Sequence, residues 1–494
     1  MPLLPTLRRN RKLTPRARRP RLEALESRAV LSVTFDSVLT IGSDTASIMP
    51  TDSAVDAAGN TYVTGILQAP MDFDPAAVQA DGSDILVPRG TSDAYVVKYN
   101  ADNSFAWARS MGSDYVQSGS NYYERGNGVR VDGTGNVFVT GTFYGQADFG
   151  AFRLTSAGYS DAFVVKLDPT GNTVWAKSWG GANQDIGSDI AIDTAGNVIS
   201  VGSSSIPYST NPNDGWIENA SELRKYSPTG AAVWSQTIAG PTGGAYGVTT
   251  DAAGNIYVCG RFSGTVDFNT DPRKTNRVSG NYGSSYVLKL TSSGSFGWVS
   301  SFATRTTTAT YGSAMTINDI AVDTAGNVVV GGNFQGQIDF DPSSSIDYRL
   351  SDTRRVNGFV VKLASNGSLA WARHTGGDAV TAVAVDVAGA VYTTGYFSST
   401  GFSPGFGLPD VASNGASDWY LTKYTASGSP AWALTFGGAG SESCYGLTVD
   451  ASGTIYLAGY YGPGTTDFDP DPLTTRERTN TAFSDMFLLK LRQS

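Results

Sequence analysis

The chain has 494 residues, of which 58 are glycine and only 16% are charged, and its formal net charge is −9. An acidic protein repels the phosphates of nucleic acids and of anionic membranes, which argues against both as partners. No apolar stretch approaches the roughly 18 residues of a membrane-spanning helix, so we expect no transmembrane segment. Abundant glycine and sparse charge are typical of many short strands joined by tight turns.

Residues 1–28 differ from the rest, because they carry nine basic and two acidic groups and leave a net charge of −16 on the remainder. They lack the apolar run of a standard secretory signal. We interpret residues 1–32 either as a disordered basic tail or as a targeting leader, with nucleic-acid binding as a weaker alternative. Residues 19–28 and 30–32 are similar to the "LExLExR…LS" leader of exported planctomycete proteins. This resemblance implies export to the envelope or the exterior.

A turn of the form Asp-x-x-Gly-Asn, with close variants, recurs seven times between alternating strands. Its aspartate accepts hydrogen bonds from the backbone that follows, and its glycine supplies the positive φ of a tight hairpin. The turns begin at Asp56, Asp132, Asp193, Asp251, Asp323, Asp386 and Asp450. Seven copies, roughly 65 residues apart, indicate one repeat protein rather than several domains.

Each repeat also has a strand that ends in lysine, and in six repeats a tryptophan lies nine residues after it. The lysines are Lys98, Lys166, Lys225, Lys289, Lys362, Lys423 and Lys490. The tryptophans are Trp107, Trp175, Trp234, Trp298, Trp371 and Trp432. The constant interval predicts a second tight hairpin. Four strands per repeat predict an all-β fold over residues 33–494, a seven-bladed β-propeller of four-stranded antiparallel blades.

The seventh repeat is one strand short, because the tryptophan after Lys490 would fall at position 499. Residues 33–43 form an unpaired strand before the first repeat, and they end like the strand that bears Trp107. We expect this strand to complete the seventh blade, which removes two exposed sheet edges. Either Ser37 or Phe35 takes the position of the tryptophan.

The innermost strands are expected to carry small side chains, because the blades converge at the axis. The residue two positions before the turn aspartate is alanine or threonine in six repeats and Arg130 in the second, which is expected to project into the channel. A catalytic propeller should line its channel with several Asp, Glu, His or Arg side chains. Alanine and threonine at these positions therefore favour a protein that is not an enzyme.

The repeat resembles the SBBP family of bacterial β-propeller repeats in segments such as 160–166, 171–176 and 191–197. The resemblance covers about residues 33–494 and implies an exported or surface propeller. The family has no single activity, so it transfers no functional residue. The turn is also similar to that of NHL repeats, and residues 168–175 are similar to a quinoprotein dehydrogenase blade. The count of seven blades argues against a quinoprotein.

The chain offers few groups for catalysis. His374 is its single histidine, and one histidine without a partner makes neither a catalytic triad nor a zinc site, so we expect a solvated turn or strand-end side chain. Cys259 and Cys444 lie in different repeats, which indicates no disulfide framework, and Cys259 is expected to be a buried inert thiol. We therefore assign no catalytic, cofactor-binding or metal-binding residue.

An Asp-Phe-Asp-Pro element makes calcium the one cofactor to consider. It occurs at residues 72–75, 339–342 and 467–470, with variants at 267–272 and 148–149. Two carboxylates two residues apart suit calcium, but the six or so spaced oxygens of a calcium loop are lacking. We favour a proline turn in which aspartate caps the strand and phenylalanine packs between blades.

Two further sets of residues are candidates for binding. The seven lysines would suit an anion-binding belt, although we favour lysines that cover an aromatic ring and meet surface carboxylates. Exposed aromatic residues in loops outside the repeat frame would suit glycans or protein partners, although loop aromatics often only cover the edge of the core. They are Tyr122, Tyr123, Tyr208, Trp216 and Tyr461.

We therefore expect a monomeric, exported or cell-surface propeller that is not an enzyme and binds a protein or carbohydrate ligand on its loop faces. One alternative is a propeller enzyme, of lyase, hydrolase or quinoprotein type, with a metal near the central channel. The other alternative is a purely structural envelope protein.

Overall fold

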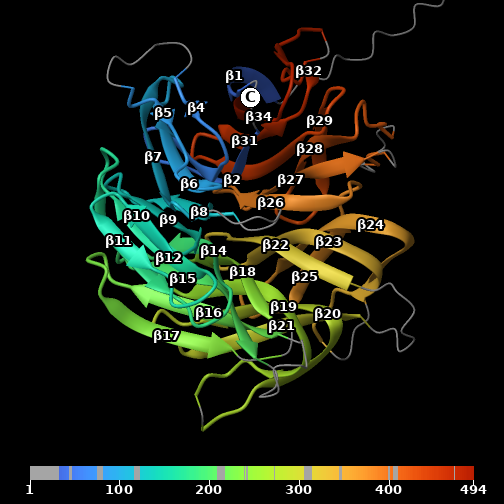
Figure 1. Ribbon diagram of the computed structural model, residues 1–494. Coiled ribbons are helices and arrows are strands. Elements are labelled where there is room, and N and C mark those ends of the chain that lie inside the picture. Colours follow the sequence, from blue (N-terminus) through green and yellow to red (C-terminus); the bar gives the residue numbers. More distant parts are fainter. Residues whose placement is uncertain are drawn as a thin grey trace, which may run out of the picture.

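The computed structural model describes residues 33–43, 47–74, 82–115, 123–207, 217–238, 240, 243–271, 273–304, 314–343, 348–398, 401–403, 410–471 and 473–493. In this part of the chain every element is a strand, and seven antiparallel blades surround a central axis (Figure 1). The predicted all-β, seven-bladed propeller is confirmed. The segment 1–32 lies outside the described residues, so its role as a leader stays a prediction.

Each blade has four strands, named in order from the innermost to the outermost. Blades 1 and 2 consist of β2 (Ile48–Val55), β3 (Thr61–Leu67), β6 (Asp93–Tyr99) and β7 (Phe105–Ser113), and of β8 (Arg125–Val131), β9 (Val137–Phe143), β12 (Asp161–Leu167) and β13 (Thr173–Trp179). Blades 3 and 4 consist of β14 (Asp185–Ile192), β15 (Val198–Pro207), β16 (Ile217–Tyr226) and β17 (Ala232–Ile238), and of β18 (Gly244–Thr250), β19 (Ile256–Asp267), β20 (Arg277–Leu290) and β21 (Phe296–Thr304).

Blades 5 to 7 complete the ring. Blades 5 and 6 consist of β22 (Ala314–Val322), β23 (Val328–Asp339), β24 (Arg349–Leu363) and β25 (Leu369–His374), and of β26 (Ala379–Val385), β27 (Val391–Ser398), β28 (Ser417–Tyr424) and β29 (Pro430–Phe436). Blade 7 consists of β30 (Ser443–Val449), β31 (Ile455–Tyr461), β34 (Asp485–Gln493) and β1 (Val33–Ile41).

Short ribbons extend the connections between the second and third strands of three blades. They are β4 (Met71–Asp72) with β5 (Ile85–Leu86), β10 (Gln146–Phe149) with β11 (Phe152–Thr155), and β32 (Gly464–Asp467) with β33 (Glu477–Asn480). Because adjacent strands are antiparallel, these connections lie at the end of the ring where the chain enters each innermost strand. We call this end the loop-bearing face. The opposite end carries the two tight hairpin turns of each blade.

The turn aspartates organise the hairpin between the first two strands of each blade. In blade 2 the Asp132 Oδ1 accepts the backbone N–H groups of Thr134 and Asn136, both at 2.9 Å, and the Asn136 amide donates to its Oδ2 at 2.8 Å. Gly135 has a φ of 82°. Although burial alone would raise the pKa of Asp132, these hydrogen bonds lower it. The predicted chemistry of the turn is confirmed.

The tryptophans join each blade to the next. The Trp107 indole N–H donates to the Pro169 carbonyl at 3.0 Å, and its ring covers Gly171 so closely that a Cβ on that glycine would lie 2.7 Å from it. Equivalent contacts link Trp175 with Gly230 and Trp371 with Gly428. The interval between lysine and tryptophan is therefore constant because the tryptophan must reach the second hairpin of the following blade.

Strand β1 closes the ring as predicted, by pairing antiparallel with β34 from Val33 opposite Gln493 to Ile41 opposite Met486. Ser37 lies opposite Lys490, as Trp107 lies opposite Lys98, so Ser37 takes the tryptophan position. Blade 1 accordingly has Asn103 where other blades have the glycine beneath a tryptophan. Asn103 keeps a positive φ of 67°, and its amide donates to the Ser37 hydroxyl at 3.1 Å.

Candidate functional site

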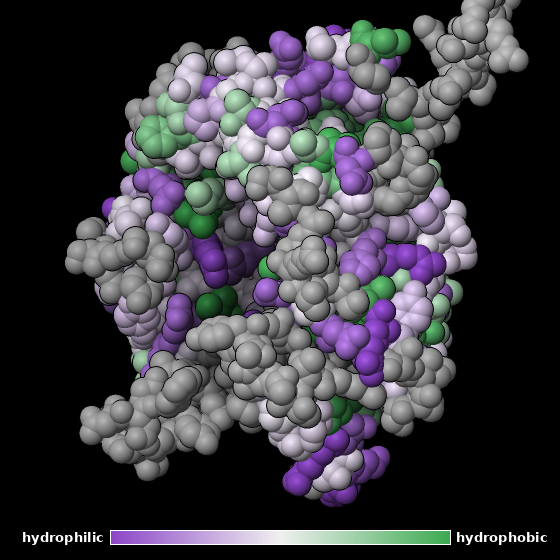
Figure 2. Space-filling model, turned by 90° about the vertical axis from the view of Figure 1, so that its right-hand side faces the viewer, coloured by the Kyte–Doolittle hydropathy of each residue, from purple (hydrophilic) through white to green (hydrophobic). Residues whose placement is uncertain are grey.

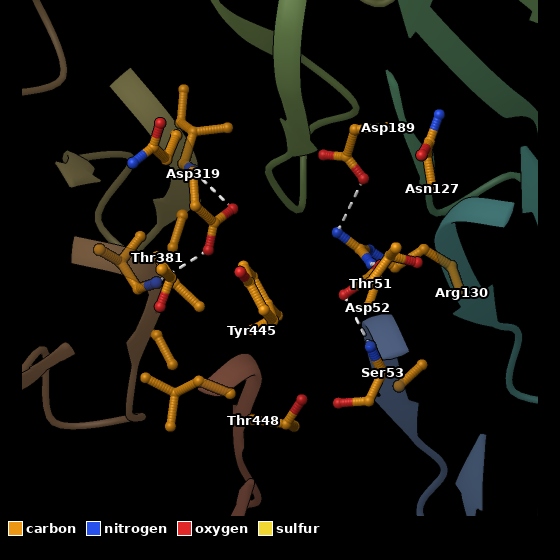
Figure 3. A pocket seen from close by; sticks show the side chains of 18 of the residues that line it. Thr51, Asp52, Ser53, Asn127, Arg130, Asp189, Asp319, Thr381, Tyr445 and Thr448 are labelled. Atoms are coloured by element: carbon orange, nitrogen blue, oxygen red, sulfur yellow. Dashed lines mark hydrogen bonds and ion pairs between the residues drawn. The ribbon is translucent and has the colours of Figure 1, made fainter. Parts of the chain in front are cut away.

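The innermost strands enclose an axial cavity of about 380 Å³, which we take as the candidate site (Figure 3). All seven blades contribute to its wall. Its lining is largely polar, whereas the space between blades is filled by aliphatic and aromatic side chains. The cavity follows from the ring itself, because seven strands that converge at an angle leave space at the axis.

Every innermost strand has a β-bulge at the same register, in its half nearer the loop-bearing face. A bulge places an extra residue out of register and turns its side chain aside. The seven bulge residues, all polar and all lining the cavity, are Thr51, Asn127, Ser188, Tyr246, Asn318, Thr381 and Tyr445. They form a polar ring around the axis.

Four of these bulge residues donate a hydrogen bond to a backbone carbonyl of the next blade. Thr51 donates to Gly126 at 2.6 Å, and Thr381 donates to Cys444. Asn127 donates to Gly187, and Asn318 to Val380, both at 2.7 Å. The single O–H of each threonine is used within the wall, so its oxygen is left as an acceptor, whereas each asparagine amide has a second N–H.

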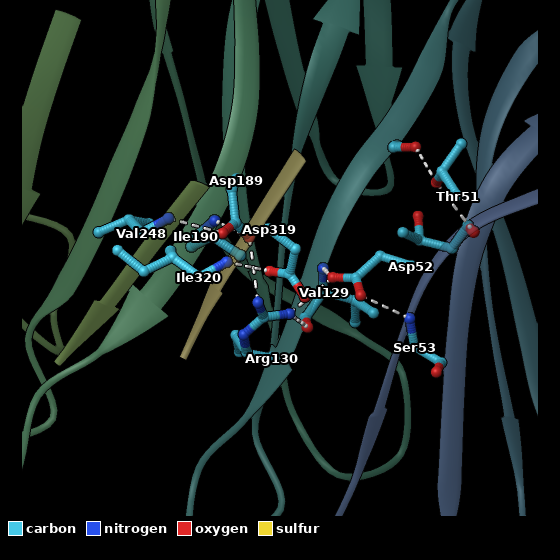
Figure 4. A network of polar contacts seen from close by, with 12 residues as sticks. Thr51, Asp52, Ser53, Val129, Arg130, Asp189, Ile190, Val248, Asp319 and Ile320 are labelled. Carbon is cyan, nitrogen blue, oxygen red and sulfur yellow. Dashed lines mark hydrogen bonds and ion pairs between the residues drawn. The ribbon is translucent and has the colours of Figure 1, made fainter. Parts of the chain in front are cut away.

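The residue after the bulge is an aspartate in blades 1, 3 and 5 and is glycine or alanine in the others. Each aspartate ties its blade to the next by accepting a backbone N–H. The Asp52 Oδ2 accepts from Val129 at 2.9 Å, and the Asp189 Oδ2 accepts from Val248 at 2.8 Å. The Asp319 Oδ2 accepts from Val383 at 2.8 Å (Figure 4 shows Asp52, Asp189 and Asp319).

Among the residues that the structure describes, Arg130 is the one cation that lines the cavity. Its guanidinium lies 2.6 Å from Asp52 and 3.1 Å from Asp189, and so joins blades 1, 2 and 3 (Figure 4). Burial alone would lower the pKa of Arg130, but the carboxylates around it outweigh burial and raise that pKa. The expected projection of Arg130 into the channel is confirmed.

Asp319 faces this cluster from blade 5, on the other side of the cavity (Figure 3). It accepts hydrogen bonds from two backbone N–H groups, those of Ile320 at 2.7 Å and Val383 at 2.8 Å. Burial, with the charge of Asp189, raises the pKa of Asp319 to about 7. Burial raises the pKa of Asp189 to about 6, although the charge of Arg130 opposes the rise. Tyr445 stands between the two sides in this view and is 37% exposed.

The expectation that alanine and threonine dominate the channel is wrong. Small residues such as Ala54 and Thr448 do line it, but three aspartates and an arginine stand beside them. The error comes from reading one position in each strand, because the aspartates lie two residues before Ala54 and its counterparts and therefore face the same side of the sheet. The signal was readable four positions before each turn aspartate, where Asp52, Asp189 and Asp319 lie at one register.

The remaining candidates for catalysis lie elsewhere. His374 is exposed at the end of β25, with its ring centroid 5.1 Å from that of Phe334. This agrees with a strand-end side chain. Cys259 and Cys444 are free and buried in the innermost half of blades 4 and 7, and burial raises the pKa of both thiols.

The Asp-Phe-Asp-Pro elements form turns. In the element that begins at Asp339, the Oδ1 of this aspartate accepts the N–H groups of Asp341 and Tyr348, both at 3.1 Å. Phe340 is fully buried, with its ring centroid 5.1 Å from that of Phe359. The predicted capping and packing are confirmed. Within the described residues, no group of three or more His, Cys, Asp or Glu side chains is arranged to hold a metal ion.

The lysines contact an aromatic ring or the turn aspartate of their own blade, and several also donate to the next blade, as Lys225 does to the Ser292 carbonyl at 2.8 Å. Five lie over the aromatic ring that follows the turn, as Lys423 does at 4.9 Å from the centroid of Tyr392. In blades 3 and 5 that residue is aliphatic, and the lysine pairs with the turn aspartate instead, Lys225 with Asp193 at 2.8 Å and Lys362 with Asp323 at 2.9 Å. Stacking on aromatic rings is confirmed.

The loop aromatics are only partly placed. Tyr122, Tyr208 and Trp216 lie outside the described residues. Tyr461 is 2% exposed and packs edge-on against Phe468, so its assignment to an exposed loop is wrong. Tyr123 is half-buried. The described surface that Figure 2 shows mixes hydrophilic side chains with small, separate hydrophobic patches. No helix long and apolar enough to cross a membrane occurs in the described ranges.

No family model matches the chain. The uncharacterized WD repeat-containing protein L264 of Acanthamoeba polyphaga mimivirus is 23% identical over 476 residues, which cover 79% of this chain and 34% of that protein. The chain thus spans about a third of the length of this curated relative.

Solved structures with a similar fold include a chain of the mitotic checkpoint complex, with a TM-score of 0.43, 11% identity and coverage of 92% of this chain and 96% of that one. The pyranose dehydrogenase PQQ domain of Coprinopsis cinerea has a TM-score of 0.35, 12% identity and coverage of 92% and 97%. Likenesses this weak carry no argument about function, so the chain is described by its fold, a β-propeller repeat protein.

Proposed function

We propose that the protein is an exported, non-catalytic β-propeller that binds a protein or carbohydrate ligand on its loop faces, with the axial cavity as the ligand site. One observation carries the proposal: the polar side chains that differ from blade to blade gather in this cavity. Repeated residues, by contrast, are used in turns, blade contacts and packing. Residues that vary between blades are not fixed by the repeat and are the ones that can recognise a ligand.

Export rests on the resemblance of residues 19–32 to a leader and of the repeat to the SBBP family. Fractionation of the producing cells would test it, and the proposal expects the protein in the envelope or the medium. Recovery in the cytoplasm alone would contradict export without bearing on the binding site.

Binding is tested by a thermal-shift screen of the purified protein against glycans, calcium and EDTA. The proposal expects a ligand that raises the Tm in proportion to its occupancy, and a Tm that calcium and EDTA leave unchanged. Stabilisation by calcium over several degrees would instead support calcium ligation by the Asp-Phe-Asp-Pro turns.

The acidic cavity also favours a second candidate, a propeller enzyme that acts on a polysaccharide. Asp189 and Asp319, with pKa values raised by burial to about 6 and 7, have the proton affinity that general acids and bases need near neutral pH. Cleavage of a polysaccharide by the wild-type protein, abolished by Asp319→Asn, would replace the first proposal with this one.

A further inference from the structure

The axial cavity holds more negative than positive charge. Three carboxylates and one guanidinium line it, and Arg130 contacts two of the three. Asp319 has backbone donors at 2.7 and 2.8 Å, and Arg130 lies closer to the other two aspartates than to it. A carboxylate has about four acceptor sites, so roughly two remain on Asp319 for a ligand.

The uncharged polar residues of the wall also favour a ligand that donates hydrogen bonds. Thr51, Asn127, Asn318 and Thr381 line the cavity, and each donates a side-chain hydrogen bond to a carbonyl of the next blade. Each threonine has a single O–H, which is already used, so its oxygen acts towards a ligand as an acceptor, and this favours a ligand that donates hydrogen bonds. This observation is independent of the count of acidic groups.

We infer that the axial cavity binds an organic cation, an ammonium or guanidinium group, with Asp319 as its counter-ion and Tyr445 beside it. The inference rests on the proposed function, because it names the chemistry that the cavity recognises. A volume of about 380 Å³ is at the small end of ligand sites and suits one basic side chain or a small amine. The half-exposed ring of Tyr445 supplies an aromatic face to such a cation.

The affinity of the cavity for a cation should depend on pH. Burial raises the pKa of Asp319 to about 7, so its carboxyl is largely protonated at pH 6 and largely ionised at pH 8. A cation binds the ionised form, so affinity should rise about tenfold between these pH values. The titratable or charged groups that face Asp319 are Asp52, Arg130, Asp189, Tyr246, Cys259 and Tyr445. Of these, Asp189 also titrates in this range, in the same direction.

Two kinds of ligand present such a cation: a small free amine and a basic side chain of a polypeptide. Isothermal titration of the full chain at pH 8 with n-propylguanidine and with the peptide acetyl-Gly-Arg-Gly-amide separates them. Peptide affinity at least tenfold above that of n-propylguanidine assigns the site to a polypeptide, and equal affinities assign it to a free amine. Both outcomes support an organic-cation site.

Asp319→Asn is expected to weaken both ligands at least tenfold. Asp410→Asn is the matched control, because it removes the same charge from an exposed loop residue outside the cavity, and it should leave both affinities unchanged. If Asp319→Asn does not fold, the tenfold rise in affinity from pH 6 to pH 8 in the wild-type protein takes its place as the test.

Three results would overturn the inference: no binding of either cation, equal affinities in Asp319→Asn and wild type, or calcium that binds in the cavity and is not displaced. These failures are distinguishable from failure of the proposed function. A glycan or protein that still binds the loop-bearing face would leave the proposed function standing. Cation binding without any such ligand would remove the glycan and protein roles but keep the site.

Discussion

The lysine at the end of each third strand makes one of two contacts, depending on the blade: it lies over an aromatic ring or it pairs with the turn aspartate. Where an aromatic residue follows the turn, the ammonium lies over its ring, and in blades 1, 4, 6 and 7 that tyrosine also donates to the turn aspartate. Where the residue is Ile199 or Val329, the ammonium itself meets the aspartate. The turn carboxylate therefore keeps a donor in each of these blades.

The two kinds of contact predict that replacing the lysine lowers the free energy of unfolding by different amounts in different blades. Lys362 and Asp323 are both 5% exposed, so Lys362→Met leaves a buried carboxylate without its cation and should destabilise the protein by about 3 kcal/mol. Lys166→Met removes an ammonium that lies over Phe138 and should cost less than about 1 kcal/mol. Urea unfolding of both variants measures the difference, and equal losses would show that the ion pair has no special weight.

At the scale of elements, the contact between a tryptophan and the next hairpin fixes the spacing between blades. A Cβ on Gly428 would lie 2.5 Å from the Trp371 ring, and this glycine has a φ of 79°. Gly453 has a similar φ of 86°, but its nearest neighbour would be 3.7 Å away. The two glycines therefore share their backbone conformation and differ in whether a tryptophan covers them.

Gly453→Ala should lose about 1 kcal/mol through backbone strain alone. Gly428→Ala should lose the same amount and about 1–3 kcal/mol more, because Trp371 must move from the hairpin of blade 6. Thermal unfolding of the two variants checks this. If both variants lost equal stability, the tryptophan would not hold neighbouring blades together.

The elements that repeat were predictable and the candidate site was not. Turns at seven aspartates, lysines at constant spacing from tryptophans, and a missing last strand are all visible along the chain. The axial charges are not repeated, since aspartate follows the bulge in only three blades. Strict alternation does place these aspartates on the inward face, but the polar bulge residues face the axis only because of pairing between strands, which the sequence does not show.

At the scale of the whole molecule, buried carboxyl groups at the seams between blades set the dependence of stability on pH. Glu442 is fully buried, and burial together with the charge of Asp418 raises its pKa to about 7. Glu124 is 4% exposed, and burial raises its pKa to about 7 despite hydrogen bonds from Ser113 and Tyr144. Both values lie above the 4.5 of an exposed glutamate.

These groups bind protons in the folded state before the unfolded state does, so stability should rise as pH falls from about 7 to 4.5. The turn aspartates act in the opposite sense, because their pKa is lowered below 3.8 and their contribution is lost as pH falls further. We expect a maximum in Tm between about pH 4 and 6.

Thermal unfolding from pH 3 to pH 8.5 tests this expectation. Glu442→Gln removes one seam carboxyl and should flatten the decline in Tm between pH 6 and pH 8, whereas Asp410→Asn should leave the curve unchanged. A wild-type Tm that rises steadily from pH 5 to pH 8 would show that the seam carboxyls are ionised in the folded protein without cost.

If the axial cavity is where the protein binds its ligand, the ionisation of Asp319 is the most direct measure of it. Difference infrared spectra of the wild type against Asp319→Asn, recorded from pH 4 to pH 9, isolate its carboxyl band. We predict a protonated carboxyl that titrates near pH 7 and ionises at lower pH when n-propylguanidine is added. A carboxyl that titrates below pH 4.5, or one that the cation leaves unchanged, would contradict a cation site at the axis.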